Sequence, residues 1–218
     1  MIILTAGHTG AGTGAQCAET HFDEGAENIW LRNRIAEILT NRYGLVVLVD
    51  DDRASLQLLV KSLTENISLT ENNLSPTNDT NIHKYENGKI ICDNLCDLWE
   101  NKEADFVIDL HFNAHTNPQA RGTEAIVSDD ATTIELRFAT RLAHATAEAL
   151  EIPLRSIKSE TQTPHRRLAM LHLTPKSIIL EICFCTSPED VAQYRKHREH
   201  LANTLAHNIT LLLDRKAR

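Results

Sequence analysis

The chain has no long hydrophobic run and no excess of positive charge. No segment approaches the roughly 18 consecutive apolar residues of a membrane helix, so no membrane span is expected. Lys and Arg total 22 against 30 Asp and Glu, which gives a net charge of −8. A nucleic-acid binder needs a basic face, so this acidic balance argues against a nucleic-acid partner.

The sequence also lacks the cysteine pattern of a disulfide scaffold. An odd number of cysteines in a chain this long is not a disulfide framework, and a four-thiolate zinc site normally uses C-x-x-C spacings. We expect buried, small apolar side chains and keep the four-thiolate site as the less favoured alternative. No histidine is paired with a cysteine in the way that a cysteine hydrolase needs. The five residues are Cys17, Cys92, Cys96, Cys183 and Cys185.

No signal peptide is visible at the N-terminus, because a strand begins at Ile2. The protein would therefore stay in the cytoplasm, be exported by another route, or have lost a leader.

The length of 218 residues and the 42% hydrophobic content fit one domain with a full core. Apolar runs predict strands at residues 2–5, 45–49, 105–110, 122–127, 152–158 and 178–182. Periodic apolar faces predict helices at 24–43, 55–63, 90–99, 132–150 and 188–213. This alternation indicates an α/β fold, in which a mostly parallel, twisted sheet has helices on both faces. Thr64 to Asn81 is rich in Asn, Thr and Ser and reads as a loop.

Side chains that can bind a metal ion or transfer a proton lie at or near the ends of three predicted strands. His8 comes just after the first strand, His111 ends another, and Glu181 lies near the end of the last. The carboxyl ends of strands are where α/β proteins build sites. Two histidines and a carboxylate brought together there suit a catalytic zinc with an open position. The glycines around His8 also allow a nucleotide-binding loop, but the G-x-G-x-x-G fingerprint is broken there.

Glu24 begins the first long helix, where an acidic residue also complements the helix dipole. It is the candidate third ligand because His8 and His111 need one. A lone histidine at a strand end is more often a surface residue. The assignment of His111 as a ligand therefore depends on its neighbours in the sequence. Asp109 lies on the same strand face and could orient the His111 ring or face a neighbouring helix.

Glu181 is the most informative single residue, because an apolar strand surrounds it. A carboxylate there is costly unless it is paired, protonated or beside a metal. Near a zinc-bound water it would serve as general base and then general acid. The alternative is a structural ion pair with Arg166 or Arg167.

Four motifs together resemble the zinc-dependent N-acetylmuramoyl-L-alanine amidases of the amidase 3 type. The segments are Ile-Leu-Thr-Ala-Gly-His8-Thr-Gly-Ala-Gly-Thr-Gly-Ala, Glu24 with Arg32-Asn33, Asp109-Leu-His111-Phe-Asn-Ala, and Leu180-Glu181-Ile-Cys-Phe-Cys-Thr-Ser-Pro. Their order and spacing match across nearly the whole chain. The resemblance implies a phosphorylase/hydrolase-like amidase fold and a single catalytic domain over residues 1–218.

The same resemblance implies zinc held by His8, Glu24 and His111, with Glu181 as the catalytic residue that activates water. Glu24 is preferred to Glu27 because of its spacing to Arg32-Asn33. The implied reaction is hydrolysis of the amide between N-acetylmuramic acid and L-alanine in peptidoglycan. A non-catalytic cell-wall-binding module of the same fold, or a zinc hydrolase acting on another amide, are the alternatives.

Action on peptidoglycan implies a place at the cell wall, in the periplasm or outside the cell. With no visible signal peptide, phage-type release or cytoplasmic storage would both be compatible with it. The sequence departs from the family pattern at Ala6, at Asp50-Asp51-Asp52, and in an insertion-like loop at about 64–87.

Shortening the segment from Thr64 to Asn81 should leave the metal bound and change stability or substrate range only modestly. Its polar composition cannot build a core, and Pro76 interrupts regular structure. Metal content of the purified deletion variant is the measurement. Loss of the metal would place this segment in the site.

Overall fold

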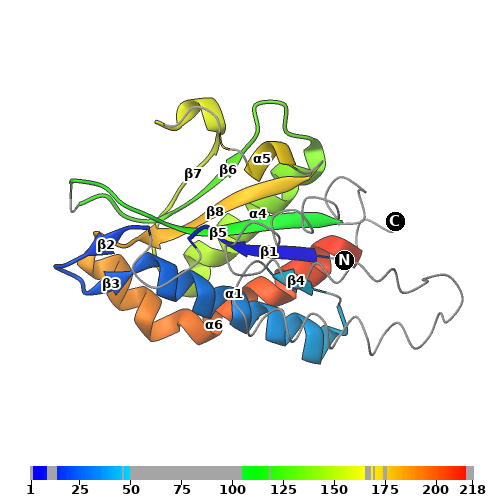
Figure 1. The fold of residues 1–218 in the computed structure, drawn as a ribbon, viewed down its shortest axis with the longest axis horizontal. Coiled ribbons are helices and arrows are strands. Elements are labelled where there is room, and N and C mark those ends of the chain that lie inside the picture. The colour runs from blue at the N-terminus through cyan, green and yellow to red at the C-terminus, as the bar shows by residue number, and fades with distance from the viewer. Residues whose placement is uncertain are drawn as a thin grey trace, which may run out of the picture.

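Six strands form a mostly parallel sheet in the computed structural model, which describes residues 2–8, 14–45, 47–49, 105–117, 119–164, 168, 170–173 and 176–214 (Figure 1). In spatial order they are β4 (Val47–Val49), β1 (Ile2–Ala6), β5 (Phe106–Asn113), β8 (Ser177–Phe184), β6 (Thr123–Val127) and β7 (Leu154–Ser159). The first four are parallel, β6 runs antiparallel to β8, and β7 is parallel to β6. The predicted α/β architecture is confirmed.

Three long helices share one face of this sheet: α1 (Glu24–Tyr43), α4 (Thr133–Leu150) and α6 (Pro188–Asp214). Helix α6 packs against both α1 and α4. Alternate residues of the central strands, such as Ile108, Leu110 and Leu180, join the main core beneath them. Only every second residue of a strand joins this core, because successive side chains point to opposite faces of the sheet.

The opposite face of the sheet carries the short helix α5 (Met170–Leu173). Leu171 packs there against Ile126 and Ile179, which alternate with the residues of the main core. By the same alternation His111, Glu181 and Glu124 belong to this second face. The face that the three long helices cover therefore holds the main core, and these polar residues of β5, β8 and β6 lie on the opposite face.

Local signals explain the ends of the helices. Asp23 caps α1 by accepting a hydrogen bond from the Ala26 amide at 3.0 Å. Gly44 ends that helix with φ 64°, a left-handed conformation that favours glycine. Thr132 and Glu135 form a reciprocal capping box at the start of α4.

Several predicted boundaries shift. Strands β5 and β8 run further, to Asn113 and Phe184, so their polar residues lie within the strands rather than beyond them. A small hairpin of β2 (Gln16–Cys17) and β3 (Phe22–Asp23) precedes α1, where no strand was predicted. The 3-10 helix η2 (Glu160–Gln162) follows β7, where no helix was predicted.

Other predictions lie outside the described residues. They are the helices at 55–63 and 90–99, the loop from Thr64 to Asn81 within the 64–87 insertion, Asp50 to Asp52, the Cys92 and Cys96 pair, and the arginines at 166 and 167. Among the described helices, none is long and apolar enough to cross a membrane.

Candidate metal centre

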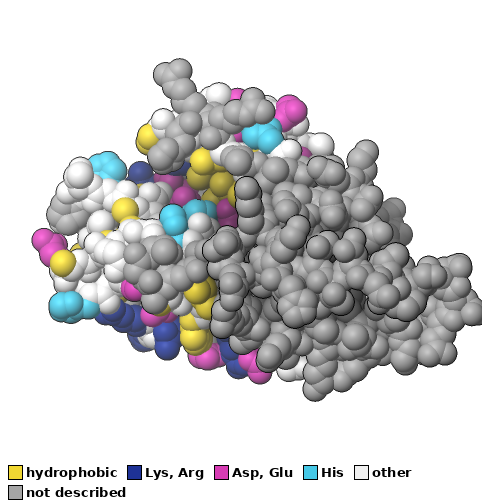
Figure 2. Space-filling model, viewed as in Figure 1, with side chains coloured by type: hydrophobic (Ala, Val, Ile, Leu, Met, Phe, Trp, Pro, Cys, Tyr) yellow, Lys and Arg dark blue, Asp and Glu magenta, His cyan; other side chains and the backbone are white. Residues whose placement is uncertain are grey.

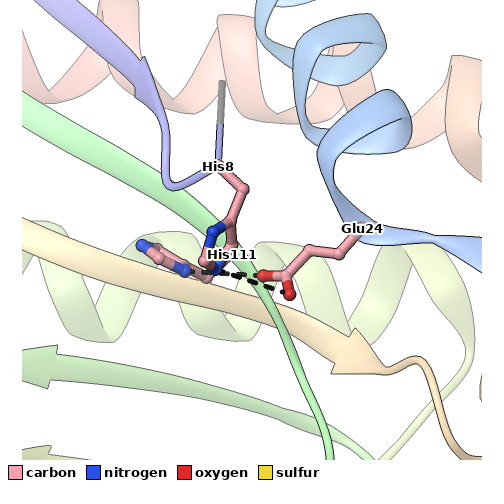
Figure 3. A group of neighbouring side chains, drawn as sticks. All are labelled: His8, Glu24 and His111. Carbon is pink, nitrogen blue, oxygen red and sulfur yellow. Dashed lines mark ion pairs between the residues drawn. The ribbon is translucent and has the colours of Figure 1, made fainter. Parts of the chain in front are cut away.

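His8, Glu24 and His111 come together at the carboxyl edge of the sheet (Figure 3). His8 follows β1, Glu24 is the first residue of α1, and His111 lies in β5. One ligand atom from each residue lies within 4.8 Å of the others. The structure thus gathers three residues that are up to 103 positions apart in sequence, which is 111 minus 8.

The carboxylate of Glu24 faces both imidazole rings. His8 Nε2 lies 3.7 Å from Glu24 Oε2, and His111 Nδ1 lies 3.5 Å from Glu24 Oε1. The two rings meet edge to face, with centroids 5.4 Å apart. The His8 side chain is 38% exposed while that of Glu24 is 4% exposed, so the group opens to solvent on the His8 side.

Backbone amides fix the orientation of Glu24. Its Oε1 accepts a hydrogen bond from the Phe112 amide at 3.0 Å, and its Oε2 accepts one from the Ala15 amide at 2.7 Å. Burial raises the pKa of Glu24, but the hydrogen bonds from His111 and these amides outweigh it and hold the pKa below its ordinary value. Glu24 is therefore a carboxylate, the form that binds a metal.

Asp109 orients the ring of His111. Asp109 Oδ2 lies 3.0 Å from His111 Nε2, and Thr5 Oγ1 donates to Asp109 Oδ1 at 2.7 Å. Burial lowers the pKa of His111, but Asp109 and Glu24 reverse this and raise it well above its ordinary value. With Nε2 turned to Asp109, Nδ1 is the nitrogen left facing the centre.

Two glycines make room for this group. A Cβ on Gly7 would lie 1.9 Å from the His111 ring. Gly14 has φ +73°, and a Cβ there would lie 2.5 Å from the His8 ring and 2.6 Å from Glu24 Oε2. The glycines thus allow the backbone to approach these side chains closely. This agrees with the prediction that the glycine-rich segment around His8 forms part of a metal site.

Glu181 lies beside His111 on the neighbouring strand, in register with it. Its Oε2 is buried and has no hydrogen-bond partner among the described residues. Burial is the largest cause that raises the pKa of Glu181 to about 7. Such a group exchanges a proton near neutral pH, as a general base must.

Glu124 on β6 completes a row of polar side chains across the sheet, because it is in register with Glu181. Asn113 Nδ2, Arg155 Nε and Lys158 Nζ donate to its carboxylate at 2.9, 2.8 and 2.6 Å. Sequence reasoning missed this cluster. The signal was available, since Glu124 is a carboxylate in an apolar strand just as Glu181 is.

Glu27, the competing carboxylate in the same helix turn, points elsewhere. It accepts hydrogen bonds from the Tyr194 hydroxyl at 3.1 Å and from Arg198 Nη1 at 3.0 Å. The Arg198 guanidinium also lies 4.2 Å from the centroid of the Trp30 ring. Glu27 thus joins α1 to α6 and stays out of the metal group.

The space-filling view shows histidine and acidic side chains meeting next to hydrophobic ones on the described surface (Figure 2). His8, Glu24 and His111 form a group that could hold a metal ion, and Glu181 lies beside it in an α/β sheet. This arrangement is typical of metal-assisted hydrolases.

The comparisons specify this class. The sequence model of the amidase 3 family, described as N-acetylmuramoyl-L-alanine amidase, matches residues 2–211. The chain belongs to this family of enzymes. The comparison with curated proteins gave no match.

Solved structures share the fold at low identity. An N-acetylmuramoyl-L-alanine amidase from Clostridium difficile 630 is 17% identical with a TM-score of 0.67, over 98% of this chain and 96% of that chain. The CwlV catalytic domain from Bacillus (Paenibacillus) polymyxa var. colistinus is 17% identical with a TM-score of 0.64, over 98% of each chain. AmiC2 of Nostoc punctiforme is 15% identical with a TM-score of 0.65, over 98% and 97%.

Glu24→Ala should weaken zinc binding by at least about 100-fold, more than the 10–100-fold that loss of an outer partner costs. Glu27→Ala is the matched control from the same helix turn, and it should keep near-normal zinc affinity because its partners are Tyr194 and Arg198. Competition with a chelating dye measures both. An equal loss in the two variants would contradict the ligand assignment.

Glu181→Gln should stabilise the metal-free protein, and more so at pH 8 than at pH 5. The pKa of Glu181 is raised from 4.5 to about 7, so the unfolded chain releases this proton first and stability falls as pH rises through that window. One pKa unit is worth about 1.4 kcal/mol, and since the side chain is partly exposed we expect about 1–3 kcal/mol.

Urea denaturation at both pH values, with a chelator present, measures this difference. The exposed Glu148→Gln change in α4 is the control. If the gain for Glu181→Gln were the same at pH 5 and pH 8, burial would not be raising the pKa of Glu181.

Proposed function

We propose that this protein is a zinc-dependent amidase that hydrolyses the bond between N-acetylmuramic acid and L-alanine in peptidoglycan. The observation that carries the proposal is the unpartnered, buried Glu181 oxygen beside the group of His8, Glu24 and His111. Family membership supports the amide as the bond that is cleaved.

The residues fit a zinc ion. Two imidazole nitrogens and one carboxylate oxygen are a donor set typical of catalytic zinc, which keeps a further position open. A Cβ on Gly14 would lie 2.5 Å from the His8 ring and 2.6 Å from Glu24 Oε2, so only a glycine lets the backbone pass this close to the two side chains. When bound, zinc lowers the pKa of water and polarises a carbonyl oxygen.

Glu181 would move the proton. Its carboxylate accepts a proton from the attacking water and then donates it to the leaving nitrogen of L-alanine, so one group acts as base and then as acid. A pKa of about 7 suits both steps near neutral pH. The base must be deprotonated at the start, so the rate should rise with pH through the pKa of Glu181, which a bound cation lowers below its metal-free value of about 7.

The other residues hold this arrangement. Asp109 keeps Nδ1 of His111 toward the centre, and the amides of Ala15 and Phe112 keep Glu24 in place. A peptidoglycan substrate implies action at the cell wall, in the periplasm or outside the cell.

Glu181→Gln should retain zinc and lose about 10²–10⁴-fold in turnover, because the amide keeps the volume of the side chain and removes the base. His111→Ala should instead lose zinc together with activity. Zinc content and release of muramoyl-peptide products, measured for each variant, separate the two roles.

Product analysis also tests the alternatives. A new L-alanine amino terminus supports the amidase, whereas another end group would indicate a hydrolase of a different amide. Zinc binding without any turnover by the unaltered protein would indicate a binding module. Near-normal turnover of Glu181→Gln would show that another group is the base.

A further inference from the structure

Two cysteines that are 168 residues apart in sequence lie in direct contact. Cys17 Sγ and Cys185 Sγ are 2.8 Å apart. A disulfide bond is about 2.0 Å long, so the two sulfur atoms need to approach by only about 0.8 Å. Cys17 belongs to strand β2 of the hairpin, and Cys185 directly follows β8.

The surroundings hold this pair in place. The Thr20 hydroxyl donates to the Cys185 carbonyl at 2.8 Å, which joins the hairpin to the end of β8. The Cys185 amide donates to the Asn113 carbonyl at 2.8 Å, which joins the same point to β5. Cys185 is buried while Cys17 is partly exposed, so a reagent in solution reaches Cys17 first.

We propose that Cys17 and Cys185 are a modification site at which oxidation forms a disulfide between the β2–β3 hairpin and the end of strand β8. This departs from the sequence-based expectation that these cysteines act as small apolar side chains. Cys183 is also buried but makes no such contact among the described residues, so the contact selects one pair.

The oxidant is a small-molecule disulfide such as oxidised glutathione. The Cys17 thiolate attacks one of its sulfur atoms, the glutathione S–S bond breaks, and one glutathione thiolate leaves. Cys185 then gives up its proton and attacks Cys17 Sγ, which releases the second glutathione. Two protein thiols are oxidised by two electrons, and one disulfide is reduced to two thiols that take up the two protons.

The second step should be the slow one. Burial is the largest cause that raises the pKa of the Cys185 thiol. Little Cys185 thiolate is therefore present near neutral pH.

The cross-link would also act on the metal centre, an effect that rests on the proposed function. Ala15, two residues before Cys17, donates to Glu24 Oε2 at 2.7 Å, and the Glu24 amide donates back to the Ala15 carbonyl at 3.2 Å. Tying Cys17 to β8 thus fixes the segment that orients Glu24 relative to the strand that carries Glu181. Reduction would loosen this link without removing a ligand.

Thiol counting tests the disulfide without reference to catalysis. In a Cys92→Ser/Cys96→Ser background, the protein is incubated with oxidised glutathione and a chelator, then denatured and titrated with a thiol reagent. Adding Cys183→Ala leaves the proposed pair alone, and both thiols should be lost while the protein stays monomeric. Adding Cys17→Ser instead leaves Cys183 and Cys185, and both thiols should remain.

The chelator prevents a metal ion held by two thiolates from being counted as a disulfide. The oxidised Cys183→Ala protein should melt roughly 5–15 °C above its reduced form, because the cross-link closes a long loop. Retention of both thiols in the Cys183→Ala protein would overturn the proposal. A stable glutathione adduct on Cys17 without the internal link would do the same.

Discussion

The candidate site depends on how one buried carboxylate is held. Glu24 lies at the first position of α1, with 4% of its side chain exposed, and each of its oxygens accepts a backbone amide from a different part of the chain. Charge-assisted hydrogen bonds of this kind are stronger than neutral ones, and they compensate for burial. The hairpin before α1 and the end of β5 are both tied to this carboxylate. The two imidazole rings meet edge to face, and each presents a nitrogen to one oxygen of the Glu24 carboxylate.

The sequence predicted much of the fold and the proximity of the site residues. Local signals in the sequence predicted strands and helices. The apolar run from Phe106 to Leu110 lies in strand β5, and the periodic apolar residues of 24–43 lie in helix α1. The hairpin of β2 and β3 was missed because two-residue strands carry almost no periodic signal. Its presence depends on tertiary contacts, such as the hydrogen bond from Thr20 to Cys185, which no local pattern reveals.

Side-chain partners were harder to predict than positions. The sequence left open whether Asp109 orients His111 or faces a helix, and only the distance of 3.0 Å decides it. The spacing of Glu24 and Glu27 could not show that Glu27 accepts hydrogen bonds from Tyr194 and Arg198, which lie on a helix far along the chain. The position of Glu124 in an apolar strand is visible in the sequence, but its place beside Glu181 is not, because it depends on which strand lies next to β8.

The direction of β6 explains why Glu124 matters. Strand β6 runs antiparallel to β8, so it begins at the edge where β8 and β5 end. A parallel strand would bring its last residues to that edge, whereas β6 brings its first ones. Glu124 therefore lies beside Glu181, and its charge helps to raise the pKa of Glu181. Arg155 and Lys158 balance that charge. The sheet therefore holds two neighbouring carboxyl groups in different surroundings. Glu124 is paired with two cations, whereas burial raises the pKa of Glu181 to about 7 and its Oε2 has no hydrogen-bond partner among the described residues.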